Sequence, residues 1–285
     1  MEFDIGDVVN DGFERLATSI GAVVIVGWAL FGIVRTAAGQ DIFRAVLERL
    51  LEVFENPEFR DQLNPEQLQA VEELETEINT SLADLPLALG LGPIAAVAVW
   101  LLAFVLGLVV VVVAMDAFGH ERESFDEVDT DRLGWKTLNL FIGTVVFAIL
   151  FVIGLFLLVL PGLVLAFLLV FFPAAIVIND ESFFDAYGSS ISVARENIVG
   201  TLAIFAIGIV TLFALGFVST IFEISLPAAG AAIAGELLSA VGIAFVWALT
   251  ARAFVDATRE REDGDEPVPE RPPGDRPESP RDGPR

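Results

Sequence analysis

Long stretches without charge constrain this chain more than any other feature. No charged residue occurs in residues 137–179, 85–115 or 16–34. A helix rises about 1.5 Å per residue, so about 20 apolar residues cross the roughly 30 Å hydrocarbon core of a bilayer. The stretches are too long and too apolar for elements of a soluble core, so the sequence predicts an integral membrane protein.

The charges lie in different segments from the apolar mass. The 285 residues are 55% hydrophobic, yet 40 Asp and Glu against 16 Lys and Arg give a formal net charge of −24. Such an acidic excess with one lysine, Lys136, is typical of halophilic proteins, in which molar salt screens self-repulsion. Repulsion from phosphates argues against nucleic-acid binding. The partner that the composition predicts is the lipid bilayer.

The charge-free stretches divide into six predicted transmembrane helices. Pro93 favours a helix start, because proline is tolerated in a first turn. Pro161 and Gly162 predict a turn between the third and fourth helices, and Pro173 predicts a kink in the fourth. Five spans would result if the segment after that turn only dips into the membrane. The six spans are residues 16–34, 93–115, two within 137–179, 197–222 and 227–250.

The predicted fold is all-α, a polytopic membrane protein with six transmembrane helices in three hairpins and amphipathic helices at the interface. Residues 1–15 are predicted to form such an interfacial helix, since their apolar side chains fall on one face. Residues 16–256 form the membrane domain, with a helical first loop at 41–82. Residues 257–285 are rich in Asp, Glu, Pro and Arg and predict a disordered tail.

Two capping patterns support helices outside the spans. Asn64, followed by Pro65 and by Gln67 at the third helical position, predicts a helix start in the first loop. A separate amphipathic helix is predicted before it, over residues 41–55. Ser182 with Asp185 three residues later predicts another helix after the fourth span.

Charges at the span ends give an orientation and a structural hypothesis. Basic residues are more numerous on the side of the N-terminus, which places both termini in the cytoplasm. An aspartate at a helix C-terminus is unfavourable to the helix dipole, so we expect these aspartates to pair with basic residues of neighbouring hairpins. The aspartates are Asp116, Asp180 and Asp256, and the basic residues before spans one, three and five are Arg15, Lys136 and Arg195.

Glu236 is the one charged residue inside the predicted spans. It would lie about 13 Å along a sixth helix that begins at Pro227, but at the interface if the span is 237–254. Buried carboxylates within spans are typical of transport proteins. Around it, Ala231, Gly235 and Ser239 repeat every four positions, which predicts close packing of the fifth and sixth spans, with a substrate groove as the alternative.

Catalytic and metal-binding patterns are not found in the sequence. With no cysteine and a single histidine, a thiolate site, a histidine zinc site and a Ser-His-Asp triad are disfavoured. Nothing in the sequence suggests a partner for His120. The acidic loop 123–131 lacks the glycine turn of an EF-hand. We therefore predict no catalytic residue, no cofactor and no metal.

One set of residues resembles a known family. The order Pro161-Gly162, Pro173, Asp180, Ser190 and Asn197 is similar to the membrane domain of glycerophosphodiester phosphodiesterases and to stand-alone multi-pass relatives of that domain in bacteria and halophilic archaea. The resemblance implies a six-helix membrane domain with interfacial helices. It does not imply phosphodiesterase activity, because in those enzymes a separate soluble barrel performs the hydrolysis.

The sequence therefore predicts a non-enzymatic multi-pass protein of the cell membrane that organises the bilayer or a membrane complex. The alternative is a transporter or export component in which Glu236 and the Pro173-kinked helix line a path. A polar cavity that reaches Glu236 would favour transport, whereas Glu236 among the headgroups of a tightly packed bundle would not. An enzyme that acts on lipid is a third possibility. The sequence predicts neither a protein partner nor an oligomeric state.

Overall fold

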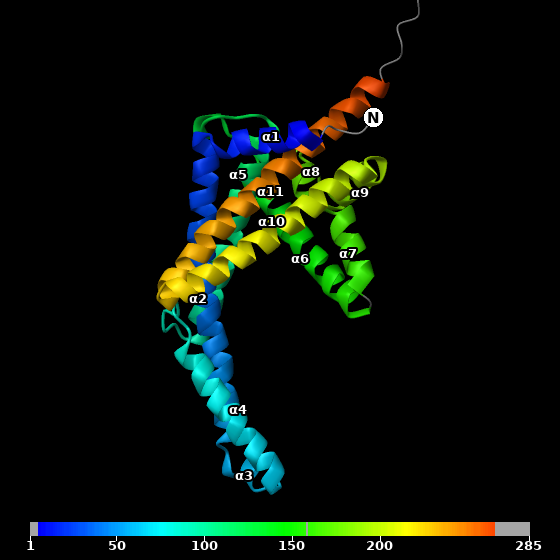
Figure 1. The fold of residues 1–285 in the computed structure, drawn as a ribbon. Coiled ribbons are helices and arrows are strands. Elements are labelled where there is room, and N and C mark those ends of the chain that lie inside the picture. Colours follow the sequence, from blue (N-terminus) through cyan, green and yellow to red (C-terminus); the bar gives the residue numbers. More distant parts are fainter. Residues whose placement is uncertain (1–4, 158, 266–285) are drawn as a thin grey trace, which may run out of the picture.

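The computed structural model describes residues 5–157 and 159–265. This part of the chain contains helices and no strand (Figure 1). Six helical segments are long and apolar enough to cross a membrane, which confirms the all-α prediction and the number of candidate spans. They are α2 (Ser19–Phe54), α5 (Pro93–Gly119), α6 (Leu133–Leu157), α7 with α8 (Val159–Leu168 and Phe172–Ile178), α10 (Ile198–Ser225) and α11 (Ala228–Asp265).

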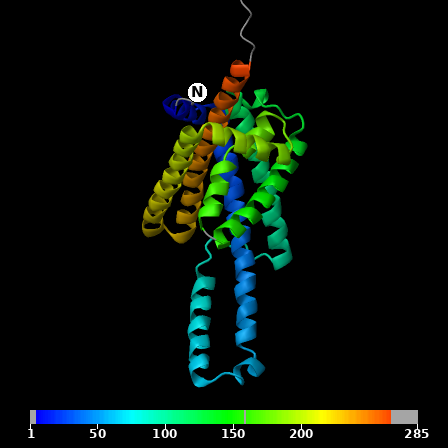
Figure 2. The same ribbon diagram turned by 90° about the vertical axis from the view of Figure 1, so that its right-hand side faces the viewer.

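The helices pair along the bundle, and α11 lies across several of them. Helix α2 packs on α5, α6 on α7 and α10 on α11, while α11 also contacts α2, α5 and α1 (Ile5–Leu16). Helix α1 and the last turns of α11 lie at the same end of the bundle, with α9 (Phe183–Glu196) beside them (Figures 1 and 2). We call this the α1 end.

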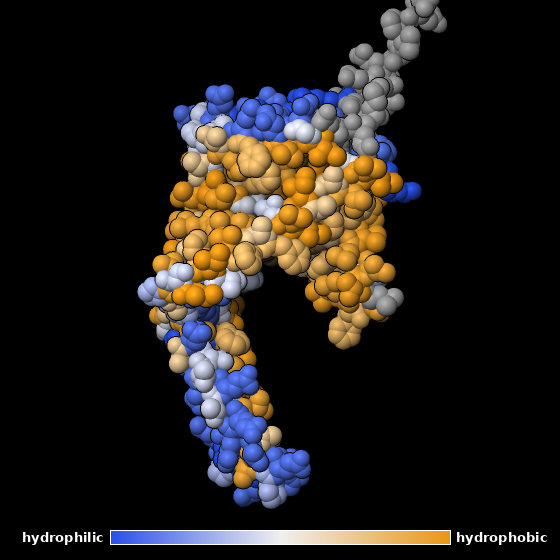
Figure 3. Space-filling model, in the orientation of Figure 1, coloured by the Kyte–Doolittle hydropathy of each residue, from blue (hydrophilic) through white to orange (hydrophobic). Residues whose placement is uncertain are grey.

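Apolar side chains form a band around the bundle between two hydrophilic regions (Figure 3). One region covers the α1 end, and the other is the helical hairpin that projects from the opposite end. The best-packed interior lies toward the α1 end, where every residue from Val111 to Gly119 of α5 is buried. Small residues of α11, such as Ala244, Ala248 and Ala251, are buried there as well and allow close contact between helices.

Helix α2 is longer than predicted. Residues 16–34 and 41–55 were expected to form separate helices, but α2 continues without interruption from Ser19 to Phe54, over 36 residues. The intervening segment contains no proline, and Ala37 and Ala38 favour helix on one side of the single Gly39, so the backbone pattern continues. At about 1.5 Å per residue, α2 is about 54 Å long and extends well past the hydrocarbon core.

The extension of α2 continues into the projecting hairpin. The chain turns through α3 (Pro57–Arg60) and returns as α4 (Pro65–Ala83), which packs on α2 (Figure 2). The predicted capping box is present, because the Asn64 side chain accepts from the Gln67 backbone and the Gln67 side chain accepts from the Asn64 backbone. The Ser182 cap of α9 is present too.

The fourth candidate span is broken, as Pro173 predicts. Helix α7 ends at Leu168, and α8 begins at Phe172 with Pro173 in its first turn. The predicted turn at Pro161-Gly162 is wrong, because α6 ends at Leu157 and α7 already begins at Val159. A first-turn proline lacks only an N–H that would be unpaired anyway. Gly162 lies so close to Gly154 that a Cβ at position 154 would be 2.9 Å from the Gly162 nitrogen.

The termini differ from the expected domain limits. Helix α1 covers Ile5–Leu16, one residue past the predicted interfacial segment 1–15, and buries Val8 and Gly12. Helix α11 continues to Asp265, beyond the predicted end of the membrane domain at residue 256. The remainder of the predicted tail, residues 266–285, and residues 1–4 lie outside the described part of the chain.

Candidate functional site

The carboxylate of Glu236 on α11 contacts α2. Thr36 Oγ1 donates to Glu236 Oε1 over 2.5 Å. One turn earlier on α2, Gly32 leaves room for the carboxylate, since a Cβ at position 32 would lie 2.6 Å from Glu236 Oε2. Gly32 and Thr36 therefore form a niche that holds the half-buried Glu236. The sequence pointed to Glu236 but not to this niche, whose only signal is a glycine and a threonine at a spacing of four.

A cavity of about 600 Å³ opens beside this niche. Its walls come from α2, α10, α11 and the segment after α4, and it carries the charges of Arg35, Asp84, Glu223 and Glu236. The guanidinium of Arg35 also lies over the Trp28 ring, 5.4 Å from its centroid. The lining residues are Arg35, Thr36, Asp84, Pro86, Ser219, Glu223, Ala228, Ala231, Ala232, Gly235, Glu236 and Ser239.

The repeat of small residues on α11 contributes to the cavity wall. Ala231, Gly235 and Ser239 all line it. A tight contact of α10 and α11 lies farther along, where a Cβ at Gly242 would be 2.1 Å from Leu215 Cδ1. The small residues at 231, 235 and 239 thus border a cavity instead of a tight helix contact. Gly242 permits the close contact between α10 and α11.

The break at Pro173 lies away from this cavity. No residue of α7 or α8 lines it, and α8 packs against α5, α6, α9 and α11. At the break, the buried Ser190 hydroxyl of α9 donates to the Leu168 carbonyl over 2.8 Å and accepts from the Phe171 N–H over 3.1 Å. Ser190 therefore stabilises an interrupted helix. The transport hypothesis placed Glu236 and the Pro173-kinked helix along one path, but in the structure they lie apart.

Asn197 marks the next change of direction. It lies between the end of α9 and the start of α10, is buried, and donates from its side-chain amide to the Val193 carbonyl over 3.1 Å. Together with Ser190, it supports the packing of α9 rather than lining the cavity.

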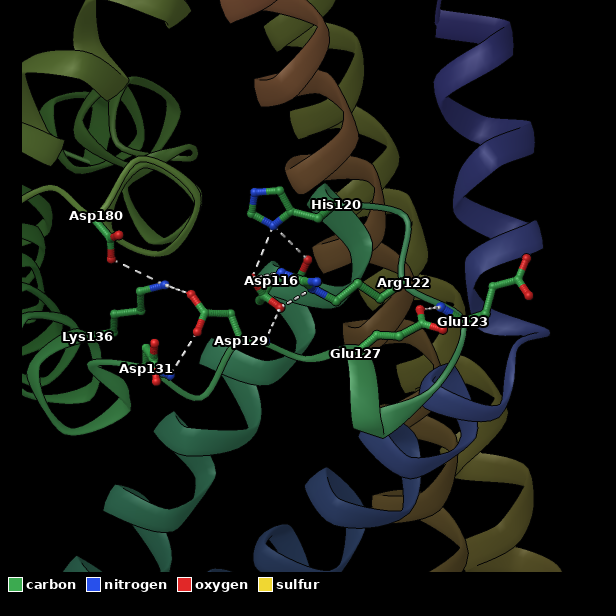
Figure 4. Close-up of polar contacts among 9 residues, drawn as sticks. All are labelled: Asp116, His120, Arg122, Glu123, Glu127, Asp129, Asp131, Lys136 and Asp180. Carbon is green, nitrogen blue, oxygen red and sulfur yellow. Dashed lines mark hydrogen bonds and ion pairs between the residues drawn. The ribbon is translucent and has the colours of Figure 1, made fainter.

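A second polar cluster lies at the α1 end around Asp116 (Figure 4). Asp116 is 1% exposed near the C-terminus of α5. Its carboxylate accepts from Arg122 Nε over 2.6 Å and from the Asp129 N–H over 3.0 Å. His120 Nδ1 lies 3.1 Å from Asp116 Oδ1. These donors compensate a negative charge at an unfavourable helix end.

The expectation that His120 has no partner is therefore wrong. Asp116 precedes His120 by four residues, a spacing that brings side chains together at the end of a helix. The hydrogen bond that His120 donates to the Asp116 carboxylate raises the pKa of His120 above its ordinary value of 6.5, although burial opposes the increase.

Lys136 lies between two carboxylates in the same region (Figure 4). Its side chain is 3% exposed, and Nζ is 3.2 Å from Asp180 Oδ1 and 3.7 Å from Asp129 Oδ2. Asp180 has a φ of 55°, in the left-handed region that aspartate tolerates better than most residues. The pair joins the start of α6 to the segment after α8, within one predicted hairpin rather than between neighbouring ones.

Arg252 is the centre of a third group of ion pairs. Its buried guanidinium lies 2.6 Å from Glu121 Oε1, 3.1 Å from Asp11 Oδ2 and 3.6 Å from Asp256 Oδ1. Arg15 lies 3.4 Å from Glu121 Oε2. The group connects α1, α11 and the segment that follows α5.

The predicted ion pairs are thus only partly the observed ones. Asp116, Asp180, Asp256, Arg15 and Lys136 each have a partner of opposite charge, but most of these partners are not the predicted ones. Arg252 was not among the predicted residues, although its spacing of four from Asp256 is a signal for an ion pair. Arg195 is exposed and makes no ion pair with any residue that the structure describes.

Within the described part of the chain, no three His, Cys, Asp or Glu side chains are placed so that they could hold a metal ion. What the geometry offers is a partly charged cavity at one end and structural ion pairs at the other.

Comparison with known proteins gives a family without a described activity. No curated protein and no solved structure matches the chain. A family model described as a domain of unknown function, DUF7847, matches residues 70–260. The match runs from α4 into α11 and includes the Glu236 side of the cavity, the Asp116 cluster and the broken fourth span. The chain therefore belongs to the DUF7847 family.

Proposed function

We propose that this protein is a non-enzymatic multi-pass protein of the cell membrane that organises a membrane complex. The observation that carries the proposal is the length of α2, whose 36 residues continue past the apolar band into the projecting hairpin. In this proposal the bundle is the anchor and the hairpin is the part that meets other molecules.

The base of the hairpin is held firmly to the bundle. Asp41 on α2 is 1% exposed, and its carboxylate accepts from the backbone N–H groups of Leu89, Gly90 and Leu91 over 2.9–3.1 Å. Gly90 has a φ of 75°, which glycine adopts without strain. These bonds fix the returning chain beside α2, so the hairpin has a defined direction.

The distribution of charge favours a cytoplasmic α1 end. Arg15, Arg122, Lys136 and Arg252 lie there, close to the ends of the predicted spans. Basic residues near the ends of spans are enriched on the cytoplasmic side. The hairpin is then outside the cell. The resemblance to the glycerophosphodiester phosphodiesterase membrane domain remains a prediction about fold and adds no activity.

The proposal predicts that the hairpin, rather than the cavity, is needed for assembly. Residues 45–82 would be replaced by a short Gly-Ser linker, which keeps Asp41 and its backbone partners. Membranes dissolved in mild detergent would then be analysed on native gels. We expect the full chain to migrate in a complex larger than the protomer, and the shortened chain to migrate alone.

The matched control is Glu236→Gln in the full chain, which should leave the complex intact. A wild-type protein that migrates only as a protomer, or a complex that survives removal of the hairpin, would contradict the proposal. Circular dichroism of the shortened protein checks that the bundle is still helical.

A second candidate function is the passage or binding of a small polar solute, because a cavity of about 600 Å³ reaches Glu236. In proteoliposomes, uptake of small cations that is reduced by Glu236→Gln and unaffected by Ser190→Ala would support it. Equal uptake by wild type, by Glu236→Gln and by empty vesicles would eliminate it.

A further inference from the structure

We infer that the projecting hairpin binds a basic amphipathic helix of a partner protein along an uncovered apolar stripe on α2. This inference rests on the proposed function and specifies the chemistry of the partner. The stripe consists of Phe43, Val46, Leu50 and Val53, whose exposed fractions range from 40% to 60%.

The stripe is a single helix face that the hairpin does not use for its own packing. Positions 43, 46, 50 and 53 step by three or four residues, so their side chains lie on one side of α2. The hairpin is closed by other residues, since α4 packs on α2 and buries Val71 and Ile78. Four large apolar side chains therefore remain without an intramolecular cover.

The lipid tails do not cover the stripe either. Counted from Ser19 at about 1.5 Å per residue, Val46 lies about 40 Å and Val53 about 51 Å along α2. The hydrocarbon core is about 30 Å thick. Hydrophilic residues dominate this region of the surface (Figure 3), so the stripe is an apolar surface in water.

Charge decides which molecule fits the stripe. Residues 41–84 contain twelve acidic side chains and three arginines, a net charge of −9. Two hairpins of this charge repel each other, as do the hairpin and an anionic lipid surface. A helix with apolar residues on one face and Lys or Arg on its other faces fits both the stripe and the net negative charge of the hairpin that carries the stripe.

A binding experiment with the full chain tests this inference. The protein would be placed in nanodiscs of zwitterionic lipid, and binding would be followed by fluorescence anisotropy of a labelled amphipathic helical peptide of Leu and Lys. A peptide with Glu in place of Lys is the charge control, and empty nanodiscs give the background. We expect saturable binding of the Leu-Lys peptide only.

Variants connect the binding to the stripe. Val46→Ser combined with Leu50→Ser should weaken binding about tenfold or more, because few residues carry most of the energy of such contacts. Leu89→Ser, at an exposed leucine of the hairpin base, should leave binding unchanged. Equal affinity of the double variant, or equal binding of the Leu-Glu peptide, would overturn the inference.

A cysteine at the stripe distinguishes the other occupants. The chain has no cysteine, so Val46→Cys can be labelled or cross-linked at that position alone. Cross-linking of two copies in proteoliposomes would assign the stripe to a second copy. Blue-shifted emission of a polarity-sensitive dye before peptide is added would assign it to lipid. Either result contradicts a basic helix as the occupant.

Failure of this inference differs from failure of the proposed function. If the complex in native membranes depends on the hairpin but persists in the Val46→Ser, Leu50→Ser variant, the hairpin assembles by other chemistry and only the inference is wrong. If the complex does not depend on the hairpin, the proposed function itself is wrong.

Discussion

At the scale of single residues, buried polar side chains form hydrogen bonds with backbone groups that have no partner within a regular helix. Ser190 bridges the interrupted fourth span, and Asp41 caps three backbone N–H groups after α4. Both side chains are buried. An unpaired backbone donor in an apolar environment is costly, so each of these side chains has an effect larger than that of an exposed hydrogen bond.

Ser190→Ala is expected to destabilise the bundle by about 1–3 kcal/mol, because it leaves the Phe171 N–H without its buried acceptor. Thermal unfolding in detergent, followed by circular dichroism, measures the change. Ser189→Ala is the control, since Ser189 is only partly buried and makes no hydrogen bond through its side chain to another described residue. Equal midpoints for the two variants would contradict the role of Ser190.

His120 is expected to make stability depend on pH near neutrality. Because its pKa is raised in the folded protein, the charged imidazole stabilises the fold fully below pH 6.5, and this contribution is lost as the pH rises through the folded pKa. Unfolding midpoints of wild type should therefore decrease over that interval relative to those of His120→Gln. Parallel pH profiles for the two proteins would show that the Asp116 contact contributes nothing.

At the scale of elements, charges join segments that are distant in the sequence. Lys136 at the start of α6 contacts the segment after α8, and Arg252 of α11 contacts both α1 and the segment after α5. The sequence predicted charged residues at the span ends, but it did not predict their partners. Which charges meet depends on how the helices pack, and that is not encoded in local spacing.

Asp180→Asn is expected to lower the unfolding free energy by about 1 kcal/mol, since Lys136 then retains only the longer contact to Asp129. Asparagine tolerates the positive φ of this position, so the change removes charge rather than backbone geometry. Asp126→Asn is the control, because Asp126 is exposed and has no ion pair among the described residues. Detergent denaturation gives both values, and an unchanged Asp180→Asn protein would refute the structural role of this pair.

At the scale of the whole molecule, the apolar band lies between two hydrophilic regions (Figure 3). The region at the α1 end contains most of the ion pairs, and the cavity lies toward the hairpin. The cavity reaches Glu236, whereas α8 of the broken fourth span packs against α5, α6, α9 and α11 toward the α1 end (Figure 1). In the proposed topology the two ends face opposite sides of the membrane.

This topology predicts opposite labelling of two cysteine variants. Thr76→Cys lies on the hairpin and Gly188→Cys on α9, both at exposed positions. In intact cells, a membrane-impermeant maleimide should label position 76 at once and position 188 only after permeabilisation. Labelling of both positions from the same side would refute the arrangement.

The sequence by itself determined the helical class, the number of candidate spans and several caps, because these depend on local apolar runs and on residues such as Asn64 and Pro173. It misplaced the boundary between α6, which ends at Leu157, and α7, which begins at Val159, since a proline-glycine pair is compatible with either a turn or a helix. It also divided α2, since the charged residues after residue 34 mark the end of an apolar run but do not end a helix. Only the tertiary structure decided that Thr36 and Gly32 hold Glu236, that Ser190 bridges the break and that Arg252 collects three carboxylates. Except for the contact of Arg252 with Asp256, these contacts join residues far apart in the chain, and packing rather than local preference brings them together.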